Sequence, residues 1–151
     1  MGGIETIGES ICADMRERLP GQNKKQREGL SLLVATMLEV RSANLMDLAA
    51  SLPRAAERLD MRYQWISRVL GNELIEIDAV MAPYVREVLA RLGASGQRIV
   101  VIMDQTQLTD RHQAVMVAVR FGGRALPLSW RIKETRGAIG LNLPRIGGHL
   151  C

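Results

Sequence analysis

The chain has 151 residues, of which 47% are hydrophobic and 24% are charged, and its formal net charge is +4. This balance excludes a disordered polyelectrolyte and allows one large domain or two small ones with a buried core. The mild excess of positive charge favours an anionic partner, of which nucleic acid is the commonest.

The cysteines and the apolar runs indicate the cellular compartment of the protein. Cys12 and Cys151 stand far apart in the sequence and match no metal-ligand spacing, which is typical of a cytosolic protein with free thiols. No apolar run approaches the ~20 residues that span a bilayer, and the N-terminus lacks the layout of a signal peptide. We therefore expect a cytoplasmic protein with no membrane partner.

The first part of the chain, up to residue 93, is predicted to be helical because apolar residues recur at spacings of three and four. Ser42 or Asn44 is the expected N-cap of the third helix, Pro53 its end, and Pro83 the expected kink of the last. The expected helices cover, in chain order, about residues 4–19, 24–40 and 42–52, two short pieces within 54–70 that are broken near Asp60, and residues 73–92.

After residue 93 the pattern becomes that of β-strands. The run of five apolar residues at 99–103 is typical of a strand buried on both faces. Gly122-Gly123 is a hairpin signal, and Pro127 requires that its strand be an edge or locally irregular. We therefore expect an α+β fold whose helices are followed by an antiparallel meander, with strands at residues 99–103, 114–121 and 124–132.

Asp104 directly follows the apolar run. An unpaired carboxylate buried there would cost several kcal/mol, so its position needs an explanation. It is either a solvated residue at the strand end that caps a turn through Thr106, or a ligand of a hard cation. Mg²⁺ prefers oxygen ligands, and two-metal phosphoryl transfer uses such a carboxylate. The residues by themselves leave both interpretations open.

Two stretches carry a family resemblance. IVVIMDQTQL at residues 99–108 and FGGRALPL at residues 121–128 resemble the start of the catalytic domain of DDE transposases of bacterial insertion sequences, which have an RNase H-like core. In that family the first catalytic Asp follows an apolar strand and is trailed by a small hydroxyl residue, as Asp104 and Thr106 are arranged here. The segment RYQWISRVLGN is similar to the family's N-terminal DNA-binding region, and the resemblance extends over roughly residues 22–132.

The resemblance implies a domain organisation and a chemistry. The implied parts are a helical DNA-binding region at 1–93, the start of an RNase H-like core with its first three antiparallel strands at 94–135, and an irregular tail at 136–151. The implied activity is DNA transposition, for which the protein binds the double-stranded DNA at the ends of the insertion sequence. The implied location is the bacterial cytoplasm, in association with the nucleoid. Asp104 would be the catalytic and metal-binding residue, and Mg²⁺ (or Mn²⁺) the cofactor.

The family also requires a second Asp and a Glu further along the chain. Asp110 and Glu134 are the only other acidic residues after residue 98, and neither stands at the family's position. We therefore expect a truncated transposase that is catalytically incomplete. The alternatives are a non-catalytic DNA-binding regulator that competes with full-length transposase, and an unrelated α+β enzyme that uses Asp104 with His112 or Asp110.

A helix-turn-helix interpretation would place MRYQWISRVL, at residues 61–70, in a DNA groove, with arginines on phosphates and Gln64 at a base edge. Acidic residues reduce the net charge between residues 14 and 68 to about +3, so an ordinary solvated face is the alternative. The predicted DNA-binding residues are Arg54, Arg58, Arg62, Gln64, Arg68 and Arg124.

A sheet of three strands would leave an apolar strand without its neighbour. Such an edge promotes aggregation unless another strand pairs with it. We therefore expect poor solubility unless the chain associates with itself or with a full-length transposase.

Overall fold

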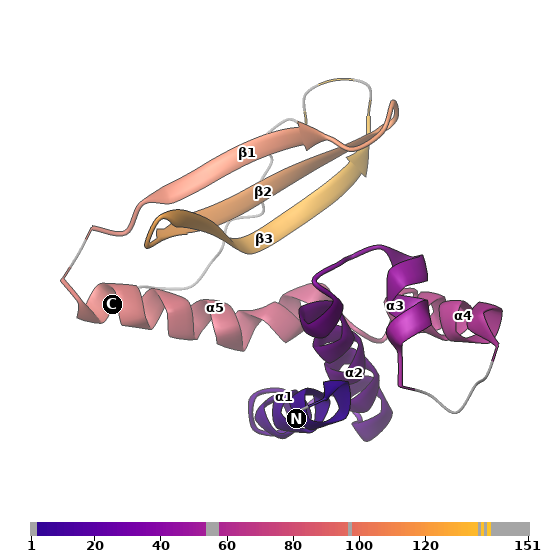
Figure 1. Ribbon diagram of the computed structural model, residues 1–151. Helices are drawn as coiled ribbons and strands as arrows, with labels where there is room; N and C mark the ends of the chain where they lie inside the picture. Colours follow the sequence, from indigo (N-terminus) through magenta and orange to yellow (C-terminus); the bar gives the residue numbers. More distant parts are fainter. Residues whose placement is uncertain (1–2, 54–57, 97, 136, 138, 140–151) are drawn as a thin grey trace. The chain divides into compact units, whose positions relative to one another are not determined.

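The computed structural model describes residues 3–53, 58–96, 98–135, 137 and 139. These residues form helices followed by one three-stranded antiparallel sheet (Figure 1), which confirms the α+β layout. The chain divides into two compact units, Met1–Pro83 and Tyr84–Cys151. The division falls at Pro83, which lies inside the last helix.

Five helices are described, and most of them match the predicted ones. The predicted break near Asp60 lies beside the start of the fourth helix, whose N-cap, Arg58, has an extended backbone, and residues 54–57 of the first predicted piece lie outside the described residues. The last helix begins later than predicted, because residues 72–75 form a turn in which the Leu74 amide donates to the Asn72 side chain at 3.1 Å. The helices are α1 (Ile4–Arg18), α2 (Lys24–Val40), α3 (Leu45–Ser51), α4 (Leu59–Leu70) and α5 (Ile77–Ala94).

Local side-chain bonds explain where α2 and α3 begin. The Asn23 side chain accepts from the Gln26 amide at 2.9 Å, and the Gln26 side chain accepts from the Asn23 amide at 3.0 Å, which makes a capping box. Asn44 is the N-cap of α3, since its side chain accepts from the Met46 amide at 2.9 Å. Ser42, the other predicted cap, instead accepts from the amide of Asn44 and donates to Asp47.

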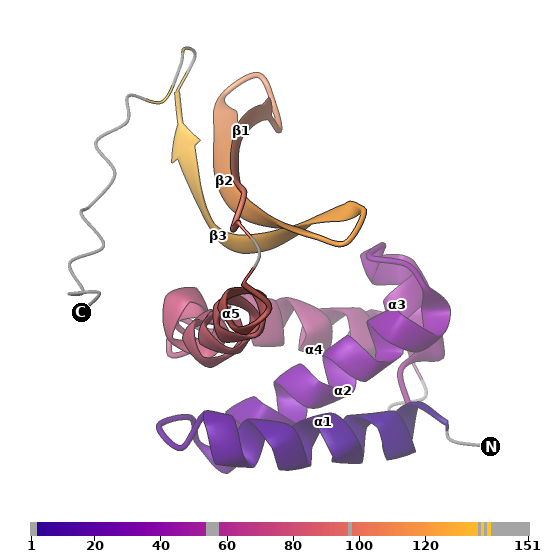
Figure 2. The ribbon, with the colours of Figure 1, turned by 90° about the vertical axis from the view of Figure 1, so that its left-hand side faces the viewer.

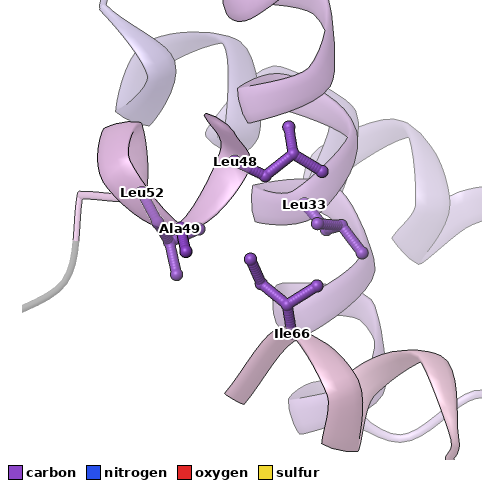
Figure 3. Close-up of a cluster of buried hydrophobic side chains, with 5 residues drawn as sticks. All are labelled: Leu33, Leu48, Ala49, Leu52 and Ile66. Carbon is purple, nitrogen blue, oxygen red and sulfur yellow. The ribbon is translucent and has the colours of Figure 1, made fainter. Parts of the chain in front are cut away.

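The core of the first unit lies where α2, α3 and α4 meet (Figure 3). Figure 3 shows Leu33 of α2 and Leu48 of α3 close to Ile66, which projects from α4. Ile66 has no exposed surface, and Leu48 has 1%. Trp65 and Val69 of α4 are partly buried and pack against this cluster. The buried residues of the cluster are Leu33, Leu48, Ala49, Leu52 and Ile66.

A glycine allows α2 and α4 to approach closely. A Cβ atom on Gly29 of α2 would lie 3.4 Å from a methyl group of Val69 and 3.9 Å from the Trp65 ring. These are ordinary contact distances for a Cβ atom, so alanine would fit at this position, whereas a side chain longer than alanine would push against Val69. The helical unit thus holds α4 in place by the burial of Ile66 and by the contact of the Val69 and Trp65 side chains with α2 at Gly29.

The second unit contains the sheet, in which β1 (Val101–Gln107), β2 (His112–Phe121) and β3 (Arg124–Glu134) follow the order β1-β2-β3. Figure 2 shows that the three strands curve together. Gly122 has φ 60° in the two-residue loop between β2 and β3, as a type II′ hairpin requires. Pro127 lies on an edge strand, and the pairing is irregular beside its partner Ala118, so both predicted conditions for this proline are met.

The first strand differs from its prediction in two respects. Asp104 is the fourth of seven residues of β1, because pairing with β2 continues through Gln107, and the carboxylate therefore does not stand at the strand end. The strand is also not buried on both faces: Val101 is 59% exposed, Ile102 39% and Met103 48%. The strand β1 lies at the edge of the sheet and has a neighbouring strand on one side only. An apolar sequence does not distinguish an edge strand from a central one, so the exposure of β1 was not predicted.

Candidate nucleic-acid interface

Helix α4 has two distinct sides. Trp65, Ile66 and Val69 face the core, and the intervening positions Met61, Gln64 and Arg68 are exposed at spacings of three and four. Residues at this spacing share one helix face. The packing that buries Ile66 therefore presents Gln64 and Arg68 to solvent, as the predicted DNA-binding role requires.

Arg62 lies on the core-facing side, since it precedes Trp65 and Ile66 by three and four positions. Its guanidinium donates to the main-chain oxygen of Ala50 at 3.3 Å, and Arg62 is only partly exposed. Ala50 is in the last turn of α3, where main-chain oxygens lack partners within the helix and the dipole favours a cation. Arg62 thus joins α4 to the end of α3.

Replacing Arg62 by alanine should lower the stability of the helical unit by about 1 kcal/mol, because the contact with the end of α3 is lost. Arg62→Lys should keep part of that stability, since a charge remains. Urea unfolding followed by circular dichroism measures both variants against Arg68→Ala, which should stay within about 0.5 kcal/mol of wild type. Wild-type stability in Arg62→Ala would contradict a structural role for this side chain.

The other predicted arginines differ in their surroundings. Arg58 is the exposed N-cap of α4 and forms an ion pair with Asp60 at 2.7 Å. An ion pair this exposed contributes little, so a phosphate can replace the carboxylate. Arg54 lies outside the described residues. Arg124 is the exposed first residue of β3, next to the hairpin, and belongs to the second unit.

The structure adds an apolar hollow that was not predicted. It is lined by Met46 of α3 and by Leu59, Asp60 and Tyr63 at the start of α4. The three apolar side chains are between 37% and 51% exposed. The spacing of four between Leu59 and Tyr63 is a signal that could have revealed this surface, because it places both on one side of the helix.

On the sheet, Asp104 is exposed and accepts a hydrogen bond from the Thr106 hydroxyl at 3.2 Å. Directly opposed residues share a face of a sheet, so Asp104 lies on the face that carries Met116 of β2 and Trp130 of β3. The carboxylate therefore has one hydroxyl partner and otherwise apolar neighbours across the strands, and its oxygens remain accessible to a cation.

The other acidic residues of this region do not converge on Asp104. Glu134 pairs with His112, four residues along β2 from the partner of Asp104, which separates the two by about 13 Å along the strands and about 10 Å across them. It forms an ion pair with Arg111 at 3.8 Å. Asp110 is in the exposed turn after β1. Asp104 could therefore supply one carboxylate ligand to Mg²⁺, but these three acidic residues do not lie close enough together to form a two-metal site.

The described part of the chain holds no group of three or more His, Cys, Asp or Glu side chains arranged to bind a metal ion. Within the same residues, none of the helices combines the length and the apolar character needed to cross a bilayer. Comparison with protein-family models, with curated proteins and with solved structures finds no match to this chain.

Proposed function

We propose that the chain binds double-stranded DNA through the exposed face of α4, as the N-terminal region of a DDE-type transposase. The observation that supports this most directly is the division of α4 into a core-facing side and an exposed side with Gln64 and Arg68. A helix backed by two others and presenting polar, basic residues is the arrangement that enters a major groove in helix-turn-helix proteins.

In this proposal each exposed side chain has a separate task. Arg68 contacts a phosphate, which positions the helix but reads no sequence. Gln64, one turn earlier on the same face, can donate to and accept from the edge of an adenine. Arg58 contacts a second phosphate by exchanging Asp60 for it. Arg62 acts on DNA only indirectly, by holding α4 against α3.

A titration with labelled DNA tests the proposal. The full chain is mixed at 50 mM salt with a duplex of the terminal-repeat DNA that flanks its gene, or with a shuffled duplex of the same composition. We expect tighter binding to the terminal repeat, because base contacts by Gln64 add to the phosphate contacts, each good base contact contributing about 1–3 kcal/mol. Equal binding to both duplexes would contradict specific recognition of the element ends. No binding to either duplex would contradict the proposed DNA-binding role.

We also propose that the sheet is the first part of an RNase H-like core, with Asp104 as one ligand of a divalent cation. Support comes from the resemblance of residues 99–108 and 121–128, and from the exposed carboxylate on the middle of β1. Since Asp110 and Glu134 lie apart from it, catalysis would need carboxylates other than those around Asp104.

The spread of these carboxylates favours a second candidate, a non-catalytic DNA-binding regulator that competes with full-length transposase. A strand-cleavage assay on terminal-repeat DNA with Mg²⁺ or Mn²⁺ separates the two. We expect the 151-residue chain to cleave no DNA and Asp104→Asn to behave like wild type. Metal-dependent cleavage that is lost in Asp104→Asn would establish the catalytic alternative.

A further inference from the structure

The outer edge of β1 presents unpaired backbone and apolar side chains together. In the described part of the chain the sheet ends at β1, and no strand pairs with its outer side. Both faces carry exposed apolar residues there, which are Ile99, Val100, Val101, Ile102 and Met103. An edge of this kind binds another strand readily, because hydrogen bonding and apolar burial act together.

The hydrogen bonds to β2 determine which residues of β1 point outward. The Arg120 amide donates to the main-chain oxygen of Val100 at 2.9 Å, and the Leu108 amide donates to that of His112 at 2.9 Å. In an antiparallel ladder alternate residues point their backbone groups to the same side. Even-numbered residues therefore face β2, and Ile99, Val101 and Met103 direct their N–H and C=O groups to the open edge.

We propose that this edge pairs with the same edge of a second copy of the chain, antiparallel and centred on Val101. In this register Val101 opposes Val101 of the second copy, and Ile99 opposes Met103. Both are hydrogen-bonded pairs, which gives about six backbone bonds across the dimer axis. Arg98 then opposes Asp104 on both sides of the axis, so each exposed charge meets its opposite.

Charge decides between the registers that the backbone allows. A register centred on Asp104 would oppose two carboxylates, and one centred on Ile102 or Met103 would oppose Asp104 to an apolar residue. Only the register centred on Val101 pairs Asp104 with a basic residue, and opposite charges across strands are stabilising where like charges are not. Because this pairing uses the sheet alone, it does not depend on the proposed DNA binding, although it uses the same Asp104 carboxylate as the proposed cation site.

Cysteine cross-linking tests the register directly. In a Cys12→Ser, Cys151→Ser background, Val101→Cys places two thiols across the axis with Cα atoms about 5.5 Å apart, within disulfide reach. Met103→Cys is the matched control, since the two copies of that residue would lie about 13 Å apart. We expect oxidation to give covalent dimer with Val101→Cys and little with Met103→Cys. Equal or stronger cross-linking of Met103→Cys, or none with either, would overturn the proposal.

A charge exchange provides a second, non-covalent test by sedimentation equilibrium. Arg98→Asp and Asp104→Arg should each weaken self-association by about tenfold or more, because two attractive pairs become repulsive. A mixture of the two variants should associate again, since both of its pairs are then complementary. Arg124→Asp, an equal charge change on β3, should associate like wild type. Association that is unchanged in the single variants, or absent from the mixture, would contradict the register.

Discussion

Ile66→Ala is expected to lower the free energy of unfolding of the helical unit by about 2–5 kcal/mol. Ile66 has no exposed surface and packs in one cluster with Leu33 of α2 and Leu48 of α3 (Figure 3). Truncation removes the contacts of its side chain with both helices and leaves a cavity that the backbone cannot fill, because Gly29 already brings α2 close to α4.

The measurement is urea unfolding, with Met61→Ala as the matched control. Met61 is on the same helix but 50% exposed, so its truncation should change stability by no more than about 0.5 kcal/mol. DNA affinity should also fall in Ile66→Ala, since α4 is no longer held against its supporting helices. Equal stability of the two variants would show that α4 does not pack through Ile66.

Arg68→Glu is expected to weaken binding of duplex DNA by about tenfold or more at 50 mM salt. The substitution removes a proposed phosphate contact and places a carboxylate against the DNA backbone, where repulsion is strong at low ionic strength. Arg68 is exposed, and its only described bond is a long one, 3.4 Å, to the main-chain oxygen of Gln64. The fold should therefore tolerate the change.

Arg16→Glu provides the control for net charge. Arg16 is exposed on α1. This helix packs mainly against α2 and makes no substantial contact with α4. The same charge change there should weaken binding less, because only the long-range attraction is reduced. If both variants lose affinity equally, the binding depends on overall charge and α4 has no special part in it.

Much of the fold could be predicted because its signals are local. Asn23, Asn44 and the Gly122-Gly123 hairpin each act through neighbours within a few residues, so the second and third helices and the antiparallel meander were predicted correctly. Asp60 lies in the first turn of α4, where the helix dipole favours a carboxylate, so this residue accompanies the start of that helix.

The candidate interface depended on information that is not local. A spacing of four identifies residues that share a helix face but does not say which face meets the core, so Arg62 and Arg68 were grouped together. The packing of Trp65 and Ile66 separates them and assigns Arg62 to α3. The exposure of β1 was missed for a similar reason, because an apolar run does not reveal whether its strand has one neighbour or two.

The most direct test of the proposed interface is the salt dependence of DNA binding by wild type, Arg68→Ala and Arg16→Ala. The logarithm of affinity falls linearly with the logarithm of salt concentration, with a slope of about −0.9 for each phosphate contacted. We predict that Arg68→Ala reduces the size of this slope by about 1, and that Arg16→Ala leaves it unchanged. A slope in Arg68→Ala equal to that of wild type would contradict contact between α4 and the DNA backbone at Arg68.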